Sequence, residues 1–423
     1  MGVLLFIILA ILIVINVPIA IALGVASVAI LAIAGNIPLV ILPQKMFAAL
    51  NSFPLMAAPF FILAGKLMEH GGISERLIEF AKSLVGQLKG GLAHVSILAC
   101  IFFAAISGSA SATTAAIGAI MIPAMVKAGY DRNFSSAIQA AAGTTGIIIP
   151  PSVPLVLYGV SASVSITSLF VAGILPGIMI GVSLMVVAYI ISWKKGYGSG
   201  VEKTSFKNIF VSFKRAILAL LMPIIILGGI YSGLFTPTEA SVVAVVYGLV
   251  IGIFVYKKIN FKVLQEILVS SVVTTSVIMF IIGTAALFGM VLTREQIPQQ
   301  VASMFLESEL SALWVLILVN LFLLVVGTFM ETIAAVIILT PILVPVMTSI
   351  GVDPVHFGII MVANLSIGLV TPPVGVSLFI AAQVGGTKFE PVVKAVIPFL
   401  LMMIVDIFLI TFIPGLTLVG TGK

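Results

Sequence analysis

Apolar segments long enough to cross a bilayer alternate with short polar loops along the chain, and this pattern occurs twice. When Gly146 is aligned with Gly368, an offset of 222 residues, the pair Pro150-Pro151 meets Pro372-Pro373 without a gap. Helix-breaking residues therefore recur at matched places in two apolar halves. In a membrane protein this pattern is typical of a transport site built between two repeats.

Each half is predicted to contain three scaffold helices, an interfacial arm, a re-entrant hairpin, a broken spanning helix and a closing helix. In the first half these elements lie at 2–16, 17–35 and 53–69, then 73–88, 92–127, 133–161 and 168–193. In the second half they lie at 215–234, 237–257 and 266–292, then 296–308, 312–348, 355–384 and 391–415. A hairpin leaves on the side it entered, so each half crosses five times and the halves are inverted.

The predicted fold class is thus an all-α polytopic membrane protein with two inverted repeats. The first repeat covers 1–193, with a scaffold at 1–89 and transport elements at 92–161. A Gly-containing cytoplasmic linker at 194–214 leads to the second repeat at 215–423. That repeat has a scaffold at 215–308 and transport elements at 312–384.

Composition supports the membrane assignment, because the chain is 61% hydrophobic and only 8% charged. The net charge of +6 does not indicate nucleic-acid binding, since the basic residues sit in short loops and form no patch. With the linker in the cytoplasm, 17 Lys and Arg residues lie inside and only Lys45, Arg294 and Lys423 lie outside. The positive-inside rule then places both termini in the periplasm and the chain in the inner membrane.

The predicted hairpin tips are rich in hydroxyl groups, and each tip should face the break of its own repeat. Backbone that stops being helical at membrane depth exposes carbonyl groups, which suit hard cations when small hydroxyls lie nearby. We therefore expect two related Na⁺ sites with a substrate between them. The residues proposed from this pattern are Ser107, Ser109 and Gly146 to Pro151 in the first half, and Gly327, Thr328, Glu331, Thr332 and Gly368 to Pro373 in the second.

Candidates for contact with the substrate itself are Ser111, Thr144 and Arg294. Ser111 taken alone is better explained by close helix packing. For Arg294 two explanations are equally favoured: it attracts an anionic substrate, or it pairs with Glu295. Asp406 is expected to pair locally. For the hydroxyl tips as a set, function is favoured over packing because the breaks repeat at matched positions.

No enzyme signature accompanies these elements. His70, His94 and His356 are dispersed and lack metal-ligand spacing, and no Walker loop or cysteine pair occurs. An ATP-driven pump is therefore excluded, no bound cofactor is expected, and an ion gradient becomes the natural energy source.

Four motifs together resemble the large membrane subunit of a tripartite ATP-independent periplasmic (TRAP) transporter. They are the Asn16-Val-Pro-Ile-Ala-Ile-Ala-Leu-Gly start, Pro59-Phe-Phe-Ile-Leu-Ala-Gly, the Ser107-Gly-Ser-Ala-Ser-Ala-Thr tip and the Gly146-x-x-x-Pro-Pro break. The resemblance covers essentially the whole chain. It implies an elevator mechanism, in which hairpins and broken helices slide as one body past a scaffold.

The resemblance also implies Na⁺ coupling, a small four-helix membrane subunit as a separate chain, and a periplasmic binding protein that delivers the substrate. Carried over by motif, Ser107, Gly146, Ile149 and Pro151 match the first Na⁺ site, and Glu331, Gly368, Thr371 and Pro373 match the second. Substrates in such systems are small organic acids, here with sialic acid as the first expectation and C4-dicarboxylates as the second.

Two rival hypotheses remain. A stand-alone Na⁺/carboxylate symporter of the same architecture would transport without a binding protein. An intramembrane enzyme would need acidic or histidine clusters at membrane depth, whereas only the isolated Glu331 and Asp406 are found.

Overall fold

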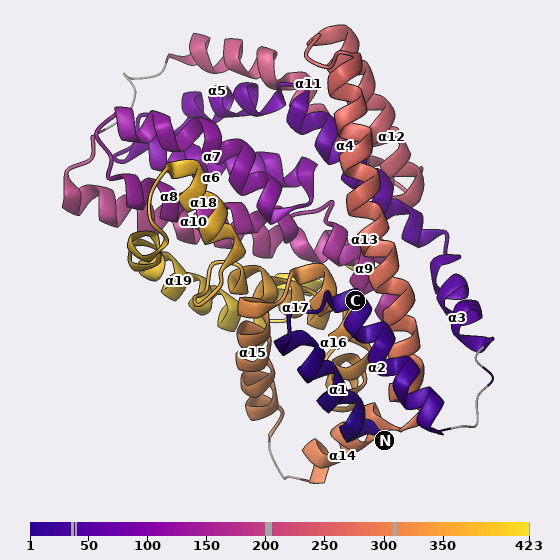
Figure 1. Ribbon diagram of the computed structural model, residues 1–423. Coiled ribbons are helices and arrows are strands. Elements are labelled where there is room, and N and C mark those ends of the chain that lie inside the picture. Colours follow the sequence, from indigo (N-terminus) through magenta and orange to yellow (C-terminus); the bar gives the residue numbers. More distant parts are fainter. Residues whose placement is uncertain (35–37, 39, 199–204, 308–310, 423) are drawn as a thin grey trace.

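The computed structural model describes residues 1–34, 38, 40–198, 205–307 and 311–422, and every regular element in these ranges is a helix (Figure 1). The first half contains α1 (Gly2–Val14), α2 (Ile19–Ala34), α3 (Ile41–Leu50), η1 (Pro54–Met56), α4 (Ala57–His70), α5 (Ile73–Val85), α6 (Gly91–Ser107), α7 (Ala110–Lys127), α8 (Arg132–Gly143), η2 (Thr144–Ile147), α9 (Val153–Ala162) and α10 (Ile166–Lys195).

The second half contains α11 (Phe206–Tyr231), α12 (Pro237–Val250), η3 (Ile251–Val255), α13 (Phe261–Arg294), α14 (Ile297–Glu307), α15 (Ala312–Phe329), α16 (Thr332–Ser349), α17 (Pro354–Gly368), α18 (Val376–Gly385), α19 (Phe389–Phe412) and α20 (Gly415–Leu418). Among the described residues, eight helices are long and apolar enough to cross a membrane, or nine if one bent pair is counted as a span. The predicted all-helical membrane fold is confirmed.

The two halves pack on each other in a matched way. Helix α2 of the first half packs along α13 of the second, and the pair related to it by the repeat, α12 of the second half and α4 of the first, packs likewise. At the centre, Ser366 Oγ donates a hydrogen bond to the Thr144 carbonyl oxygen at 2.8 Å, and these two positions are 222 residues apart. Equivalent positions of the two repeats therefore meet directly, where η2 contacts α17.

Helix ends within the repeats are set by matched capping residues. Asp131 precedes α8 and accepts a hydrogen bond from the Phe134 N–H at 2.8 Å. Its counterpart Asp353 precedes α17 and accepts one from the Val355 N–H at 2.7 Å. A carboxylate at this position satisfies free N–H groups and suits the positive end of the helix, so both broken helices begin in the same manner.

The scaffold differs from the prediction at α3, which was missed. The sequence indicated a third helix only at 53–69, but α3 precedes it and the two are bent by 66° relative to one another. At the repeat offset, α3 and α4 correspond to the single continuous helix α13. The polar stretch Asn51-Ser52, followed by Pro54, separates the first pair, because proline removes a helix hydrogen bond and restricts the preceding residue.

The linker is shorter than the predicted 194–214, because α10 extends to Lys195 and α11 already begins at Phe206. The additional N-terminal turns of α11 pack against α5. Ser212 Oγ donates to Ser83 Oγ at 2.7 Å, and the rings of Phe213 and Phe80 lie 5.7 Å apart. Linker residues 199–204, and residue 308 of the predicted arm, lie outside the described residues. The arm α5 is thus attached to the scaffold of the other half.

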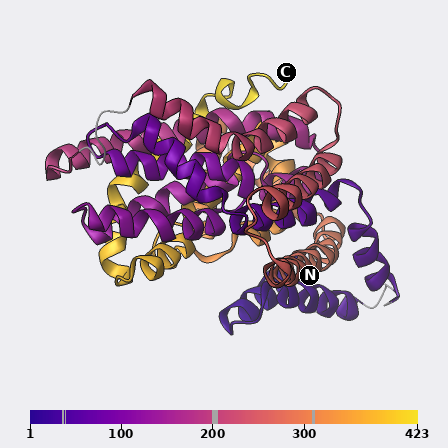
Figure 2. The same cartoon turned by 90° about the horizontal axis from the view of Figure 1, so that it is seen from above.

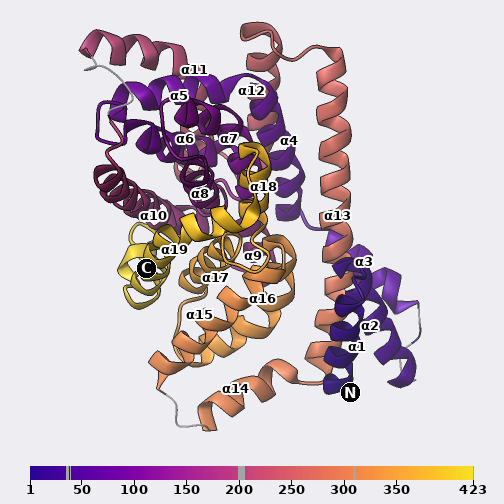
Figure 3. The same ribbon diagram turned by 60° about the vertical axis from the view of Figure 1, so that its left-hand side comes forward.

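Helices α1, α2 and α3 form a group with α13 at one side of the molecule, away from α6, α7 and α8 (Figure 2 and Figure 3). In Figure 3 the hairpin α15/α16 lies below the first-half hairpin α6/α7 and beside α1 and α2. The arrangement leaves the two hairpin tips and the two helix breaks near the centre, where the candidate site lies.

Candidate functional site

The first hairpin tip is a compact set of hydroxyl and carbonyl oxygens. Gly108 ends α6 in the left-handed region (φ 60°), and Ser109 is extended and caps α7 through its side chain. Ser107 Oγ lies 2.8 Å from Thr113 Oγ1, and Thr113 Oγ1 donates to the Ser109 carbonyl at 2.7 Å. The sequence hypothesis named Ser107 and Ser109, whereas Thr113 completes the set.

The first helix break approaches this tip closely. A methyl group built at Gly146 would lie 2.5 Å from the Ser109 carbonyl oxygen and 2.6 Å from Thr113 Oγ1. A methyl group at Gly108 would lie 2.8 Å from the Pro151 carbonyl oxygen. Glycine is thus required on both sides of the contact, and the structure brings together Ser107, Ser109, Gly146 and Pro151 as expected from their motif.

The second tip is built around a carboxylate. Glu331 caps α16, accepting hydrogen bonds from the N–H groups of Ile333 at 2.8 Å and Ala334 at 3.3 Å. A methyl group at Gly368 would lie 2.7 Å from the Gly327 carbonyl oxygen, so the tip and its break are again in direct contact. The two sites are alike in backbone construction but differ in charge.

Hydroxyl groups near the second tip are partly engaged within their own helices. Thr328 Oγ1 donates to the Val325 carbonyl at 2.7 Å, and Thr371 Oγ1 donates to the Ile367 carbonyl at 2.8 Å. The hydroxyl of Thr332 is buried and has no hydrogen-bond partner in the structure. A buried hydroxyl without a partner has free acceptor capacity, which Thr332 can offer to a cation.

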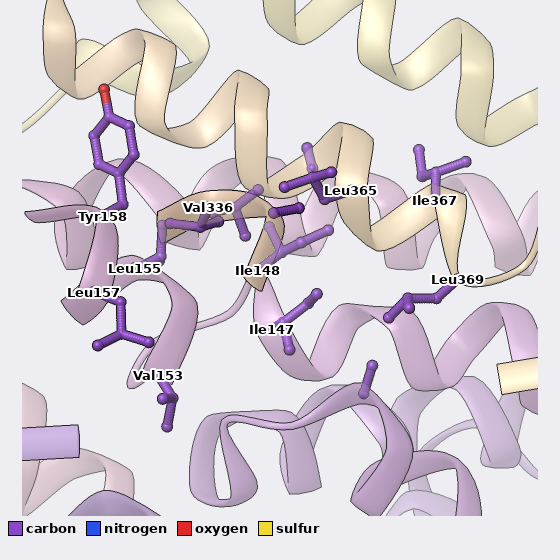
Figure 4. Close-up of a cluster of buried hydrophobic side chains, with 14 of the residues drawn as sticks. Ile147, Ile148, Val153, Leu155, Leu157, Tyr158, Val336, Leu365, Ile367 and Leu369 are labelled. Carbon is purple, nitrogen blue, oxygen red and sulfur yellow. The ribbon is translucent and has the colours of Figure 1, made fainter. Parts of the chain in front are cut away.

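Apolar side chains from both repeats surround the breaks and hold their backbone in place (Figure 4). Ile147, Ile148 and Leu155 from the first repeat and Leu365 and Leu369 from the second are all buried. In the first break, Ser152 Oγ donates to the Ile147 carbonyl at 2.5 Å. The Pro150-Pro151 and Pro372-Pro373 bonds are both cis. The side chain of Ile149 faces Gly177 of α10, so only its backbone can serve the site.

A cavity of about 220 Å³ joins these parts. It is lined by residues of both tips, both breaks and two scaffold helices, α4 and α13. Its polar and charged lining residues are Ser107, Ser109 and Ser111 from the first tip, Glu331 and Thr332 from the second, and Lys66, Glu69 and Thr274 from the scaffold. The cavity therefore lies where moving and fixed parts of a transporter would meet.

Two predicted substrate residues do not line this cavity. Thr144 is fully buried, with its hydroxyl bonded to the Ala141 carbonyl and its own carbonyl bonded by Ser366, so it belongs to the repeat interface. Arg294 lies about 30 Å along α13 from Thr274, given twenty residues at 1.5 Å each. It lines a groove with Lys45 instead, while Glu295 pairs with the Met1 ammonium at 3.4 Å.

The sequence reasoning missed the scaffold side of the cavity. Lys66 was counted only as a cytoplasmic cation, and Glu69 and Thr274 were not considered. A signal was available, because Lys66 and Glu69 are three residues apart in an otherwise apolar helix and so share one face. Charged residues that face inward from a spanning helix indicate function.

Inverted repeats with broken helices and re-entrant tips around a central cavity define a class of membrane transporter fold. The chain belongs to the DctM component family of the tripartite ATP-independent periplasmic transporters, whose family model matches residues 6–416. The resemblance found from four sequence motifs is confirmed by this match.

Several curated relatives support the assignment. The chain is 45% identical to an isethionate TRAP transporter permease of Oleidesulfovibrio alaskensis over 98% of its own length, but spans only 65% of that relative. It is 44% identical to a C4-dicarboxylate TRAP large permease of Pseudomonas aeruginosa, covering 88% of this chain and 87% of the relative. It is 43% identical to a sialic acid TRAP large permease of Vibrio cholerae, covering 89% and 88%.

Among solved structures, the Alcanivorax borkumensis YdaH transporter is similar in fold, with a TM-score of 0.63. The alignment covers 88% of this chain and 87% of that chain at 15% identity. At this level of identity the likeness shows the fold alone.

Proposed function

We propose that this chain is the transport subunit of a Na⁺-coupled importer of a small organic acid, working by an elevator mechanism. The observation that carries the proposal is the cavity lined at once by both hairpin tips, both helix breaks and the scaffold. The oxygen atoms gathered at the tips suit Na⁺, a hard cation that prefers oxygen ligands. The apolar remainder of the cavity suits the carbon skeleton of an acid.

The partners in this proposal are a small four-helix membrane subunit and a periplasmic binding protein that delivers the acid. The family name itself denotes three components, and the curated relatives are named permeases, which favours transport over enzymatic activity. We place the chain in the inner membrane with both termini in the periplasm. The ion pair between the Met1 ammonium and Glu295 supports the placement of Met1 on the same side of the membrane as the C-terminal end of α13.

The identity of the acid is not ranked by sequence similarity. Relatives named for isethionate, C4-dicarboxylates and sialic acid are 45%, 44% and 43% identical. Sequence reasoning put sialic acid first and C4-dicarboxylates second. The proposal therefore rests on the class, a small organic acid, rather than on one compound.

Uptake is expected to require sodium and all three components. Proteoliposomes containing the chain with its small subunit and binding protein should accumulate labelled acid in a Na⁺ gradient and lose that uptake when choline replaces Na⁺. Undiminished uptake driven by a proton gradient alone would refute sodium coupling. Full activity of the chain without the other two components would instead favour the stand-alone symporter.

Ser107→Ala should raise the sodium concentration needed for half-maximal uptake by about tenfold, because losing one oxygen ligand of a charged group costs on the order of 1.5 kcal/mol. Ser349→Ala is the matched control. Its hydroxyl donates to the Val346 carbonyl oxygen of its own helix, at the opposite end of α16 from the tip. An unchanged sodium requirement in well-expressed Ser107→Ala would remove Ser107 from the site.

Two roles of Glu331, its charge and its capping of α16, can be tested separately. Glu331→Ala loses both the charge and the cap of α16, whereas Glu331→Gln keeps an oxygen acceptor for the Ile333 and Ala334 N–H groups. We expect both variants to transport poorly, with only Glu331→Ala also losing thermal stability. Normal sodium-driven uptake by Glu331→Gln would show that Glu331 acts only as a cap.

A further inference from the structure

The central cavity has a charged wall that the proposed cation sites do not use. Lys66 and Glu69 extend from α4, and Thr274 faces them from α13. Lys66 Nζ donates a hydrogen bond to Thr274 Oγ1 at 3.2 Å. An ammonium group has three N–H donors, so this bond leaves capacity for a ligand.

Lys66 is not neutralised by a close ion pair. Within the described residues, the ion pairs join Met1 to Glu295 and Arg215 to Glu79, and none involves Lys66. Glu69 lies one turn away on the same face of α4, and the carboxylate of Glu331 is directed to backbone N–H groups of α16. Among the described residues, the ammonium of Lys66 therefore faces the cavity with a hydrogen bond to Thr274 but with no carboxylate at ion-pair distance.

The charges around the cavity can be balanced. The ionisable side chains that line it are one cation, Lys66, and two carboxylates, Glu69 and Glu331. With all three ionised they leave one negative charge, and the two Na⁺ ions of the proposed function would bring the loaded site to one positive charge. Uncompensated charge at membrane depth is costly, so a ligand with a single negative charge completes the balance.

The volume of the cavity limits the size of the ligand. Pockets for drug-sized ligands span about 300–1,000 Å³, and this cavity, at about 220 Å³, is smaller. The comparison favours a short-chain acid over a sugar acid with a long glycerol side chain and an N-acetyl group.

We propose that Lys66 is the anion-binding residue of this cavity and that the cavity selects a short-chain acid with one negative charge, such as a sulfonate or monocarboxylate. This inference rests on the proposed function for the charge of the two cations. It departs from both acids favoured by the sequence, because one is bulkier and the other carries two charges. Thr274 acts as a positioning residue that holds the ammonium toward the tips.

The scaffold location of Lys66 gives it a distinct role in the transport cycle. The proposed cation ligands all lie on hairpins and broken helices, whereas Lys66 lies on α4 and approaches the first tip because Gly65 permits it. A methyl group at Gly65 would lie 3.0 Å from the Ser107 carbonyl oxygen. The anion would thus contact both the scaffold and the transport elements in the state described here.

The test measures ligand-induced thermal stabilisation of the purified full chain at saturating sodium, which needs no binding protein. A ligand that binds the folded state raises its stability in proportion to the logarithm of its concentration over Kd. Isethionate and lactate serve as small monoanions, succinate as a small dianion and N-acetylneuraminate as a bulky monoanion. We expect the two small monoanions to have the lowest stabilisation midpoints.

Lys66→Gln should raise the small-monoanion midpoint by about tenfold or more, the usual effect of losing a charge-assisted hydrogen bond. Lys66→Arg should retain most of the binding, and Thr274→Val should weaken it less than Lys66→Gln does. Lys262→Gln is the matched control, since Lys262 is exposed and lies about 18 Å from Thr274 along α13. In all of these variants the sodium midpoint should stay unchanged.

Two results would overturn the inference. One is tighter binding of succinate or N-acetylneuraminate than of both small monoanions. The other is small-monoanion binding that Lys66→Gln leaves unaltered. If stabilisation by acids does not depend on sodium in the parent chain, the proposed sodium coupling fails instead, so the two failures can be told apart.

Discussion

Gly146→Ala and Gly368→Ala should each reduce sodium-driven uptake by about tenfold or more, because overpacking a close contact costs on the order of 1–3 kcal/mol. At Gly146 the added methyl group meets the Ser109 carbonyl oxygen at 2.5 Å, and at Gly368 it meets the Gly327 carbonyl oxygen at 2.7 Å. Each hairpin tip must then move away from the break it faces. Uptake at several sodium concentrations would measure the loss.

Gly228→Ala provides the control for both substitutions. Gly228 lies inside α11, and a methyl group there meets no atom within 4 Å. Since alanine is the better helix former, this variant should keep full uptake and equal or higher thermal stability. Full uptake by Gly146→Ala would mean that the contact between the first tip and its break is not part of the transport site.

Crosslinks should distinguish the moving body from the scaffold. In the elevator proposal, 92–161 and 312–384 move together past 1–89 and 215–308. The rings of Phe80 on α5 and Phe102 on α6 stack at 5.7 Å, so a cysteine pair at these positions would tie scaffold to body. A short bifunctional thiol reagent should then abolish uptake in a Cys100→Ser background, in which the serine keeps an acceptor for the Gln139 side chain.

A second cysteine pair serves as the internal control. Tyr158 Oη donates to the Pro354 carbonyl oxygen at 2.6 Å, joining α9 to the start of α17. Linking these positions connects the two repeats within the proposed moving body and should leave most of the uptake intact. The elevator mechanism is wrong if this internal link blocks transport while the Phe80–Phe102 link does not.

The repeat itself explains why much of the fold could be predicted. Hairpins and breaks are marked by glycine, proline and hydroxyl residues whose backbone effects are local, so they are visible in sequence. Helix α3 was missed because Pro43, Gln44 and Lys45 interrupt its apolar pattern. Applying the offset of 222 residues to the long apolar helix at 261–294 would have revealed it.

The sequence predicted only those site residues that belong to a local motif or occupy matched positions of the two repeats. Ser107, Gly146 and Glu331 were found in this way. Lys66 and Thr274 were not, because their meeting across α4 and α13 depends on tertiary packing that no local pattern encodes. Thr144 shows the opposite case: a hydroxyl beside a helix break suggested contact with the substrate, yet packing places it at the interface between the repeats and not in the lining of the cavity.

The hydrogen bond between Ser366 and Thr144 has a consequence for the other end of the transport cycle. The bond joins equivalent positions of the two halves. The halves nevertheless differ in shape, because α3 and α4 are bent by 66° relative to one another where the equivalent helix α13 is continuous. In an inverted repeat, exchanging the shapes of the halves generates a molecule whose cavity opens to the opposite face. In the proposed transport cycle each half would adopt, in the other access state, the shape that its partner has here.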